Sequence, residues 1–550
     1  MKHFTASGLM LSLALVSSAR AATYYIAPAG NDANVGTAAL PWKTWSWAFG
    51  HSACGDALMV QDGTYTPAAN GNFLLTKICS AAAPYSVQAQ NERRALISGN
   101  GRAAPLYIQS SAYVNVTGLR VKNIDYSSGT QVSNVTVSAS HHIALRRMVV
   151  TNNNRYFNTH VIQLTDTTDS LLEENELYWF HRHGIIFYRS DNNVARRNYC
   201  NARNYPGIPG GYNGTSGDNG TGDDCALSYP ANGNLFENNI SDGPMGKGFS
   251  VQALGRGRGN RFYGNIALNP IIGLGLDTRG SSVDTMPVDT DIRDMVVINA
   301  AAEAIRTRGA KNTTCKNCSA IAGRSDGFYN DVIPVQRGDG LYSFFCTNCL
   351  ATGNTHRGFQ VTADIQTWQI NYPSSYGNGD NFNPDASHAN IINELSEGVN
   401  PALGTCRAWV PDGSPLKRAG LNGADIGANV LYRYENGILT NKPLWDRTTG
   451  KFPCGAEIQG VNDVVGSSCV DVHTRLNVNT NGCPFPAGYG GSTPPPATDL
   501  NGDGITNVAD VQLAVNQASG VSACSTGDIN KDGACNVADV QLVINKALGL

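Results

Sequence analysis

Short apolar or β-branched segments recur along much of this chain, and this recurrence most constrains what it can fold into. Between Tyr24 and about Gln366 the segments return at irregular intervals of roughly 20 to 35 residues, separated by turns rich in Asn, Gly, Ser and Asp. No sustained helical period appears in this region. One such segment cannot bury its apolar face alone, so successive coils must stack on one another as a solenoid.

Most of the expected strands begin alike, with a polar residue, a glycine and then alternating apolar positions. Such segments start at His160, His183, Lys247, Ile272, Glu303, Asp326 and Arg357, with Val161 and Ala304 in place of the glycine. The glycine suits a turn, and alternate residues of a strand point inward and outward. Asparagine pairs such as Asn192-Asn193 and Asn238-Asn239, and the run 152–154, fall between the strands, where their amides can bond from coil to coil. We predict an all-β, right-handed parallel β-helix over residues 22–366.

The first segment of this region also resembles a known cap. Residues 24–32, together with Gly36-Thr37 and Pro41-Trp42, are similar to the N-terminal segment of secreted pectate-lyase-like β-helix proteins. The resemblance covers the cap and the general pattern of the coils, and it implies the same β-helix fold.

The N-terminus has the features of a secretory signal. Lys2 and His3 precede an apolar stretch from Leu9 to Val16, and Ala19-Arg20-Ala21 has the form of a cleavage site. The apolar stretch is about half the roughly 20 residues of a membrane-spanning helix, and no later segment supplies that length. We therefore expect residues 1–21 to be a signal peptide and the protein to be secreted or cell-surface associated, without a membrane span.

The chain has 14 cysteines, an even number that suits disulfides in an oxidising compartment. Cys315-x-x-Cys318 and Cys346-x-x-Cys349 also have the paired spacing of a four-thiolate zinc site. Disulfides or a stacked cysteine ladder fit an exported protein better.

Beyond residue 366 the coil pattern fades. Residues 367–483 contain loops, short strands and four cysteines at 406, 454, 469 and 483, which predicts a disulfide-stapled extension of the β-helix. Residues 484–498 combine glycines with the prolines 494–496 and form a linker.

The last 52 residues carry a duplicated acidic loop, with Gly504 and Gly533 at the sixth position of each copy. Calcium takes six to eight oxygen ligands from loops of this spacing, and the glycine permits the sharp turn. Apolar residues at helical spacing follow over 508–517 and 537–548. The predicted ligands are Asp499, Asn501, Asp503, Asn507 and Asp510 in the first loop, and Asp528, Asn530, Asp532, Asn536 and Asp539 in the second.

This duplicated loop and helix, in which residues 508–512 are repeated at 537–541, resembles a dockerin, including Asp at the twelfth loop position. The resemblance covers nearly all of 499–550. It implies a small α-helical domain, two bound calcium ions and a cohesin-type scaffold partner, and such modules usually accompany polysaccharide-active enzymes.

The near-neutral net charge of −3 argues against a nucleic-acid partner, which would require a basic face.

Polar side chains gather at the expected strand starts. Aligning the coils places His160, His183, Asp223, Lys247, Glu303, Asp326 and Arg357 in one ladder, with Ile272 interrupting it. Adjacent outward positions carry Tyr188, Gln252, Asp277, Arg308 and Asp331, and Arg306 lies two residues before Arg308. A polar surface with basic and aromatic residues suits an acidic polysaccharide.

Elimination from a uronic acid requires a cation for the carboxylate, a base for the proton beside it and an acid for the leaving oxygen. We expect Lys247 to be the base, His183 and Arg306 to bind the carboxylate, and Tyr188 to be the acid. The sequence thus predicts a secreted lyase of a uronic-acid-containing, pectin-like polysaccharide.

Two other functions stay open. The segments 222–225 and 246–248 resemble the Asp-Asp-Cys and Gly-His-Gly coils of polygalacturonase-type hydrolases, and Arg306-Thr307-Arg308 is loosely similar to their basic motif. That resemblance implies hydrolysis with Asp223, but His183 stands where the family has an Asp, and Lys247 replaces its His. Asp218, Asp223 and Asp224 are an alternative site for a third calcium. The last alternative is a β-helix that binds glycan without catalysis.

Overall fold

The computed structural model describes residues 21–99, 104–123, 133–152, 160–180, 182–201, 224–243, 246–278, 286–331, 342–362, 365, 367–382, 388–395, 398–455, 468–490, 498, 500, 506–521, 524, 527–529 and 534–547. The predicted signal peptide lies outside this set except for Ala21. Within the described ranges, no helix has the length and apolar character needed to cross a bilayer.

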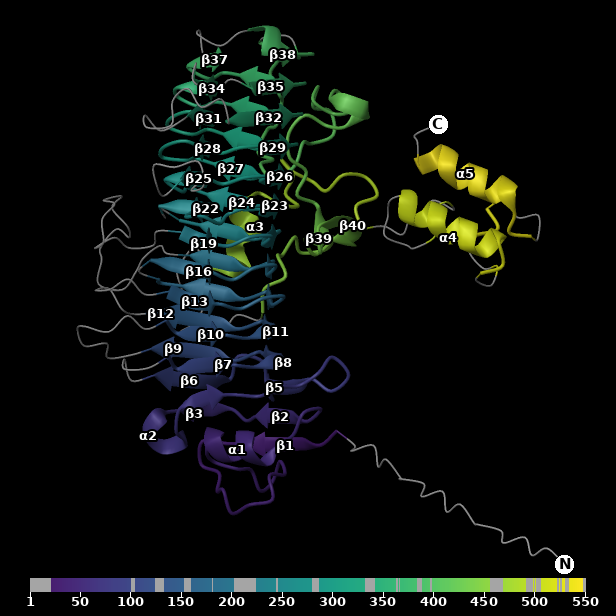
Figure 1. Cartoon of the computed structure of the whole chain (residues 1–550). Coiled ribbons are helices and arrows are strands. Elements are labelled where there is room, and N and C mark those ends of the chain that lie inside the picture. The colour runs from purple at the N-terminus through teal and green to yellow at the C-terminus, as the bar shows by residue number, and fades with distance from the viewer. Residues whose placement is uncertain are drawn as a thin grey trace, which may run out of the picture.

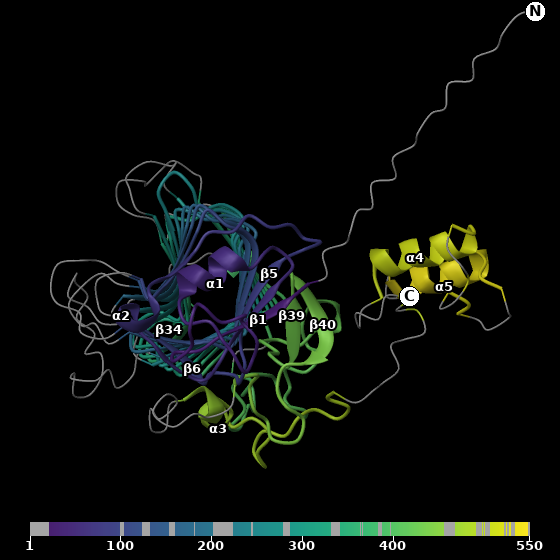
Figure 2. The same cartoon turned by 90° about the horizontal axis from the view of Figure 1, so that it is seen from below.

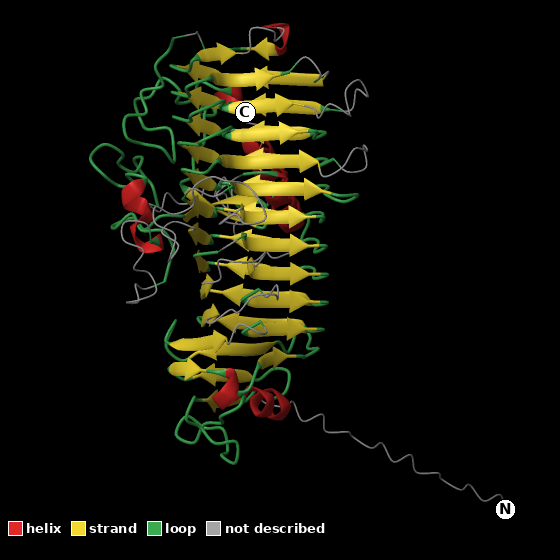
Figure 3. Cartoon of the chain, turned by 90° about the vertical axis from the view of Figure 1, so that its left-hand side faces the viewer, coloured by secondary structure: helices red, strands yellow, loops and turns green. Residues whose placement is uncertain are grey.

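Three long sheets of stacked parallel strands form the main body (Figure 1). The coils are seen end-on in Figure 2 and from the side in Figure 3. The sheets are named A, B and C here. Sheet A contains β1 (Thr23–Ile26), β2 (Ala57–Val60), β5 (Tyr85–Ala89), β8 (Ala112–Thr117), β11 (His141–Arg146), β14 (Leu171–Glu173), β17 (Val194–Arg196), β20 (Leu235–Glu237), β23 (Arg261–Tyr263), β26 (Asp291–Arg293), β29 (Thr313–Lys316), β32 (Ser343–Thr347), β35 (Thr367–Asn371) and β38 (Ile391–Ile392).

Sheet B contains β3 (Gly63–Tyr65), β6 (Ala95–Gly99), β9 (Arg120–Asn123), β12 (Val149–Asn152), β15 (Glu176–Tyr178), β18 (Tyr199–Asn201), β21 (Ile240–Asp242), β24 (Ile266–Leu268), β27 (Val296–Ile298), β30 (Ser319–Ile321), β33 (Leu350–Thr352) and β36 (Ser374–Tyr376). Sheet C contains β4 (Phe73–Leu75), β7 (Leu106–Gln109), β10 (Val135–Ser138), β13 (His160–Thr165), β16 (His183–Tyr188), β19 (Asp224–Tyr229), β22 (Lys247–Ala253), β25 (Ile272–Thr278), β28 (Ile305–Arg308), β31 (Phe328–Asp331), β34 (Arg357–Val361) and β37 (Asp380–Phe382).

From β2 to β37 each coil contributes one strand to each sheet, and β1 and β38 extend sheet A at its two ends. Neighbouring strands within each sheet pair in parallel. This arrangement is consistent with the predicted right-handed β-helix. The strands β35 to β38 continue the ladders beyond residue 366, where the prediction ended the β-helix. Helices α1 (Trp45–His51) and α2 (Pro67–Asn70) lie near its N-terminal end (Figure 1).

The interior of the coil is filled by inward side chains stacked along the axis. Phe236 lies on Phe262 with ring centroids 4.8 Å apart, and Phe328 lies on Phe359 at 4.7 Å. All four rings are buried. Truncation of one such ring to alanine typically costs about 3–5 kcal/mol, so these stacks are a main source of stability.

Asparagine ladders line the turns, as the sequence predicts. The side chain of Asn198 donates to Asn239 Oδ1 at 3.0 Å, and Asn239 donates to Asn265 Oδ1 at 3.0 Å. Asn193, Asn234 and Asn260 are likewise buried in a second set of turns. These amides bond to each other and to turn carbonyls, which satisfies polar groups that water cannot reach.

All 14 cysteines form disulfides. Cys315 pairs with Cys318 and Cys346 with Cys349, and register places Cys315 beside Cys346 in neighbouring coils. The zinc alternative for these four residues is therefore wrong, because their sulfurs are bonded to one another. The remaining pairs are Cys54–Cys79, Cys200–Cys225, Cys406–Cys483, Cys454–Cys469 and Cys524–Cys535.

The segment 398–490 packs on the outward face of sheet B. Its buried side chains join Tyr199, Ile240 and Val296 of that sheet in one apolar cluster. This segment contains β39 (Tyr432–Glu435), β40 (Ile438–Pro443), α3 (Val472–Arg475) and the 3-10 helices η4 (Leu421–Gly423) and η5 (Cys469–Asp471), and η3 (His388–Asn390) precedes it. Cys406–Cys483 and Cys454–Cys469 lie within the extension, where the prediction placed its staples.

Two carboxylates of the β-helix, the partly buried Asp294 and the buried Glu237, hold this extension in place. Tyr434 donates its hydroxyl to Asp294 at 2.6 Å, and the Asn429 N–H donates to the same carboxylate at 3.0 Å. Glu237 accepts the backbone N–H groups of Asn436 and Gly437. The extension is thus fixed by specific polar bonds as well as by apolar packing.

The C-terminal segment forms two helices, α4 (Val508–Ala518) and α5 (Val537–Ala547), which contact each other. Asn507 caps α4 by accepting the Ala509 N–H at 2.7 Å, and Asn536 makes the equivalent bond at the start of α5. The two repeats therefore begin their helices in the same way.

Candidate functional site on sheet C

Strand register brings four polar residues together at the start of neighbouring strands in sheet C. His160 pairs with His183, His183 with Asp224, and Asp224 with Lys247. The sequence alignment placed Asp223 in this ladder, but the register is one residue later. Asp223 itself lies outside the described residues. The shift arises because Cys225, bonded to Cys200, takes the position that glycine occupies in the neighbouring coils.

Lys247 reaches across the face of sheet C toward the next strand. Its Nζ lies 3.0 Å from Asp277 Oδ2 and 3.9 Å from Asp224 Oδ1. The stem of the lysine crosses Gly275, where an added Cβ would lie only 2.7 Å from Lys247 Cδ. The absence of a side chain at Gly275 therefore leaves the space in which the lysine lies.

Asp277 links Lys247 to a second cation. Arg306 on the next strand donates to Asp277 Oδ1 at 3.0 Å and lies 3.6 Å from Glu303. Burial opposes ionisation of Asp277, but Lys247 and Arg306 outweigh it and lower the pKa of this carboxyl. An amine and a guanidinium thus meet at one ionised carboxylate on the partly exposed face of the sheet.

His183 and Asp224 lie beneath this surface. His183 Nδ1 is 3.3 Å from Asp224 Oδ2, and the ring of His183 stacks on His160 with centroids 4.9 Å apart. The His183 side chain is 2% exposed and that of Asp224 is 0% exposed. Burial raises the pKa of Asp224, although Lys247 opposes this effect. Because His183 is buried against Asp224, a substrate cannot reach it as the sequence predicts. Its place beside Asp224, which in turn lies near Lys247, suits a residue that helps to position Lys247.

Tyr188 lies on the same sheet but away from Lys247. It pairs with Tyr229, and three strand steps separate it from Asp277. At about 4.8 Å for each step, that is roughly 14 Å. Tyr188 contacts Tyr229 at 6.0 Å between centroids, and the Arg189 guanidinium lies 4.5 Å from its ring. Lys247 and Arg306 therefore come together, whereas Tyr188 does not join them.

Sequence reasoning missed two residues near Lys247. Gly275 was read only as part of an alternating strand, although a glycine at an outward strand position is itself a signal of close approach. Tyr329 pairs with Arg306 on the next strand and donates to Asp331 at 3.1 Å. Burial and Asp331 raise the pKa of Tyr329 to about 12, so this hydroxyl stays protonated at neutral pH.

The alternative of a third calcium stays a prediction, because only Asp224 of its three ligands lies among the described residues. Among them, groups of three possible metal ligands occur only at Cys315, Cys318 and Cys349 and at Glu176, Cys454 and Cys469. Those cysteines are all in disulfides. Asp218, named in this alternative, also lies outside the described residues. We therefore derive no step from calcium at sheet C.

Known proteins resemble this chain at the level of fold. A family profile described as a protein of unknown function (DUF1565) matches residues 28–266. No curated protein sequence matches the chain. Similar solved structures include the pectate lyase Pel9A, with 16% identity and a TM-score of 0.39 over 74% of this chain and 96% of that one.

Two further structural neighbours have similar values. A mannuronic acid specific polysaccharide family 6 lyase from human gut microbiota has 12% identity and a TM-score of 0.44, over 67% of this chain and 85% of its own. The Dettilon tailspike protein has 13% identity and a TM-score of 0.45, over 70% of each chain. Polysaccharide lyases are thus among the structural neighbours, and the site must be judged on its own geometry.

Proposed function

We propose that this protein is a secreted polysaccharide lyase that cleaves an acidic, uronate-containing polysaccharide by β-elimination. The observation that carries the proposal is the meeting of Lys247 and Arg306 at the Asp277 carboxylate. The side chains of Lys247 and Arg306 are 12% and 19% exposed, so a polymer lying on sheet C can touch both.

The reaction assigns a different task to each cation. Arg306 binds the uronate carboxylate and stabilises the negative charge that develops there when the neighbouring proton leaves. Lys247 takes that proton from C5 after its ammonium group has released a proton to solvent. The electrons of the C–H bond form the C4–C5 double bond, and the C4–O bond breaks. Solvent supplies the proton to the leaving oxygen, because Tyr188 is too far away.

The cations around Asp277 favour an acidic substrate. Asp277 lies between Lys247 and Arg306, and a uronate carboxylate has the same charge and shape, so it would compete with Asp277 for these two cations. Arg308 is exposed on the same strand as Arg306 and adds positive charge beside it. A charged sugar is therefore attracted to this part of sheet C.

Hydrolysis fits the described residues less well. An inverting hydrolase needs two accessible carboxyl groups with room for water between them. Asp224 is completely buried, and Asp277 is held ionised by two cations. Hydrolysis and binding without catalysis stay as the alternative outcomes of the experiment below.

We also propose that residues 499–550 form a dockerin-like module that binds two calcium ions and a cohesin-type scaffold. Several predicted ligands, Asp499, Asn501, Asp503, Asn530 and Asp532, lie outside the described residues. Among those that are described, Asp510 is buried and accepts the N–H groups of Leu500 and Asn507, each at 2.8 Å. Asp539 makes the equivalent bonds to Ile529 and Asn536 at 2.7 and 2.9 Å. These bonds bring the twelfth loop residue back to the start of the loop, and calcium would then stabilise both helix N-termini.

The function is tested by incubating the protein with pectic, alginate and other uronate polysaccharides, with and without a chelator. Ultraviolet absorbance of an unsaturated product together with new reducing ends is the expected result, and Lys247→Ala should abolish both. Reducing ends without absorbance would mean hydrolysis. Binding with neither signal would mean a binding protein.

A further inference from the structure

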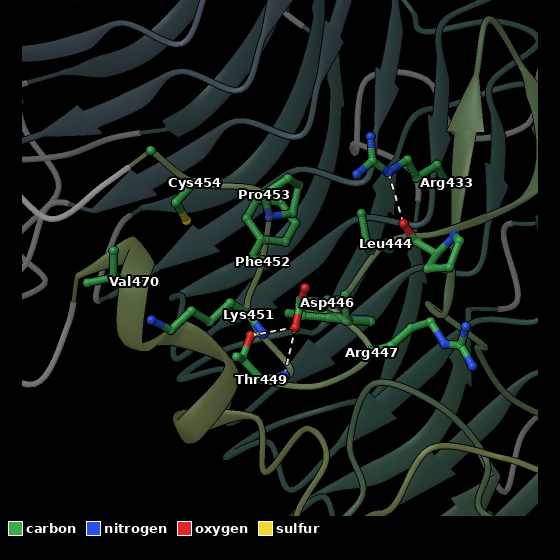
Figure 4. A pocket seen from close by; sticks show the side chains of 13 residues that line it. Arg433, Leu444, Asp446, Arg447, Thr449, Lys451, Phe452, Pro453, Cys454 and Val470 are labelled. Carbon is green, nitrogen blue, oxygen red and sulfur yellow. Dashed lines mark hydrogen bonds between the residues drawn. The ribbon is translucent and has the colours of Figure 1, made fainter. Parts of the chain in front are cut away.

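The extension on sheet B carries an open cavity of about 610 Å³ (Figure 4). Cavities of roughly 300–1,000 Å³ are the usual size for small-molecule sites. The extension packs on sheet B, whereas Lys247 lies on sheet C. The cavity is therefore separate from the proposed catalytic site.

The floor of the cavity is apolar and rigid. Trp445 and Phe452 contact each other with ring centroids 5.6 Å apart, and both are buried. The Trp445 indole N–H donates to the Val430 carbonyl at 2.7 Å, which fixes the ring. Pro443 and Pro453 add further apolar wall. The partly exposed prolines can contact the C–H face of a sugar ring, while the buried Trp445 and Phe452 support the cavity from beneath.

Three cations lie on different sides of this floor (Figure 4). Arg433 is fixed by donating its Nε–H to the Pro443 carbonyl at 2.9 Å. Arg447 lies across Gly490, where an added Cβ would be 2.5 Å from Arg447 Cδ. Lys451 and Arg447 are exposed, and the Lys451 charge adds to the Thr449 hydrogen bonds in lowering the pKa of the Asp446 carboxyl. Their charge is thus available to a ligand.

The same cavity also offers hydrogen-bond acceptors. Asp446 Oδ1 accepts the N–H groups of Thr448 and Thr449 at 3.0 and 2.7 Å and the Thr449 hydroxyl at 2.8 Å. These bonds hold a tight turn and keep the carboxylate in place. Sugar hydroxyls are donors of the kind that a fixed carboxylate binds.

We propose that this cavity is a second saccharide site, which binds a uronate-bearing sugar residue. Arg447 or Lys451 would bind the sugar carboxylate, Asp446 its hydroxyls, and the partly exposed Pro443 and Pro453 would support its apolar face. The choice of a uronate rests on the proposed function, since the site would hold the same polymer that sheet C cleaves.

The test measures binding without turnover. The full chain carrying Lys247→Ala and Arg306→Gln, which removes the uronate-binding cation of sheet C, is titrated by calorimetry with trigalacturonate and with trimannuronate, and with maltotriose as a neutral sugar. We expect one of the acidic trisaccharides to bind. Adding Arg447→Gln and Lys451→Gln should weaken this binding by about tenfold or more, since charge-assisted bonds to the carboxylate are lost. The matched control adds Lys316→Gln and Arg324→Gln, two exposed cations outside the cavity, and should bind as before.

Unchanged affinity in the Arg447→Gln, Lys451→Gln protein would overturn the proposal, as would equal binding of maltotriose or tighter binding of inorganic phosphate. These results are independent of catalysis. If the parent protein forms no unsaturated product but the cavity variants still lose binding, the lyase proposal fails and the second site stands. If product forms normally and the cavity variants bind unchanged, the lyase proposal stands and the second site fails.

Discussion

Replacing Gly275 with alanine tests whether the position of Lys247 matters for function. The new Cβ would lie 2.7 Å from Lys247 Cδ and 3.1 Å from Cε, closer than carbon atoms normally approach. The lysine stem must therefore move, and its Nζ would leave its position 3.0 Å from Asp277. A displacement of about 1 Å in a reacting group can cost 10²-fold in rate. We expect kcat/KM to fall by about 10- to 100-fold, or roughly 1.4–2.7 kcal/mol of transition-state stabilisation.

The fold should tolerate this change, because the nearest atoms to the added Cβ belong to the Lys247 and Asp277 side chains and not to the backbone. The melting temperature should therefore stay within a few degrees of the parent. Gly50→Ala is the matched control, since an added Cβ there meets nothing within 4 Å. The assay is the initial rate of unsaturated product formation on the best substrate of the panel. Parent-like kcat/KM in Gly275→Ala would refute the idea that Lys247 acts from this position.

Three further predictions follow from the same geometry. Lys247→Arg keeps the charge but cannot supply a neutral base, so product formation should be lost while thermal stability is retained; measurable turnover would exclude Lys247 as the base. Burial raises the pKa of Asp294 to about 6. The folded state thus binds this proton more tightly than the unfolded chain. The contribution of Asp294 to the free energy of unfolding is therefore greatest below about pH 4. It falls by roughly 3 kcal/mol as the pH rises from there through about 6. Asp294→Asn should flatten this part of the pH dependence of thermal unfolding, and identical profiles would contradict it. Calcium should increase the helical circular dichroism signal of the full chain, because residues 499–550 become more helical, and a chelator should reverse the change. No change in the signal would mean that the loops bind no metal.

The coils of the β-helix could be predicted because each one carries its own local signal. A turn glycine followed by alternating apolar residues marks the strands that begin at His183, Lys247 and Arg357, and these do lie in one sheet. The prediction slipped by one residue at β19, where a half-cystine replaces the glycine. A disulfide partner 25 residues away determined that position, and the local pattern could not reveal it.

The candidate site depends on distances between coils, which sequence reasoning could not supply. Lys247 and Arg306 could be placed on one face, but the role of Gly275 follows only from the path of the lysine stem across a neighbouring strand. The burial of His183 was also hidden, since its strand start looks like that of the partly exposed Lys247. The extension was harder still, because its bonds to Asp294 and Glu237 join residues more than a hundred positions apart.

The outward faces of sheets B and C differ in a way that bears on function. Sheet B presents Tyr199, Ile240 and Val296, and the extension covers them. Sheet C presents Lys247, Asp277 and Arg306, which the fold does not need for its core and which remain partly exposed. Partly buried ion pairs add little to stability once the cost of removing them from water is counted. On this face, Lys247 and Arg306 converge on the single carboxylate of Asp277. A charged ligand explains this arrangement better than folding does. This is the physical reason to look for the substrate on sheet C, and to ask whether the cationic cavity on the extension binds a second part of the same chain.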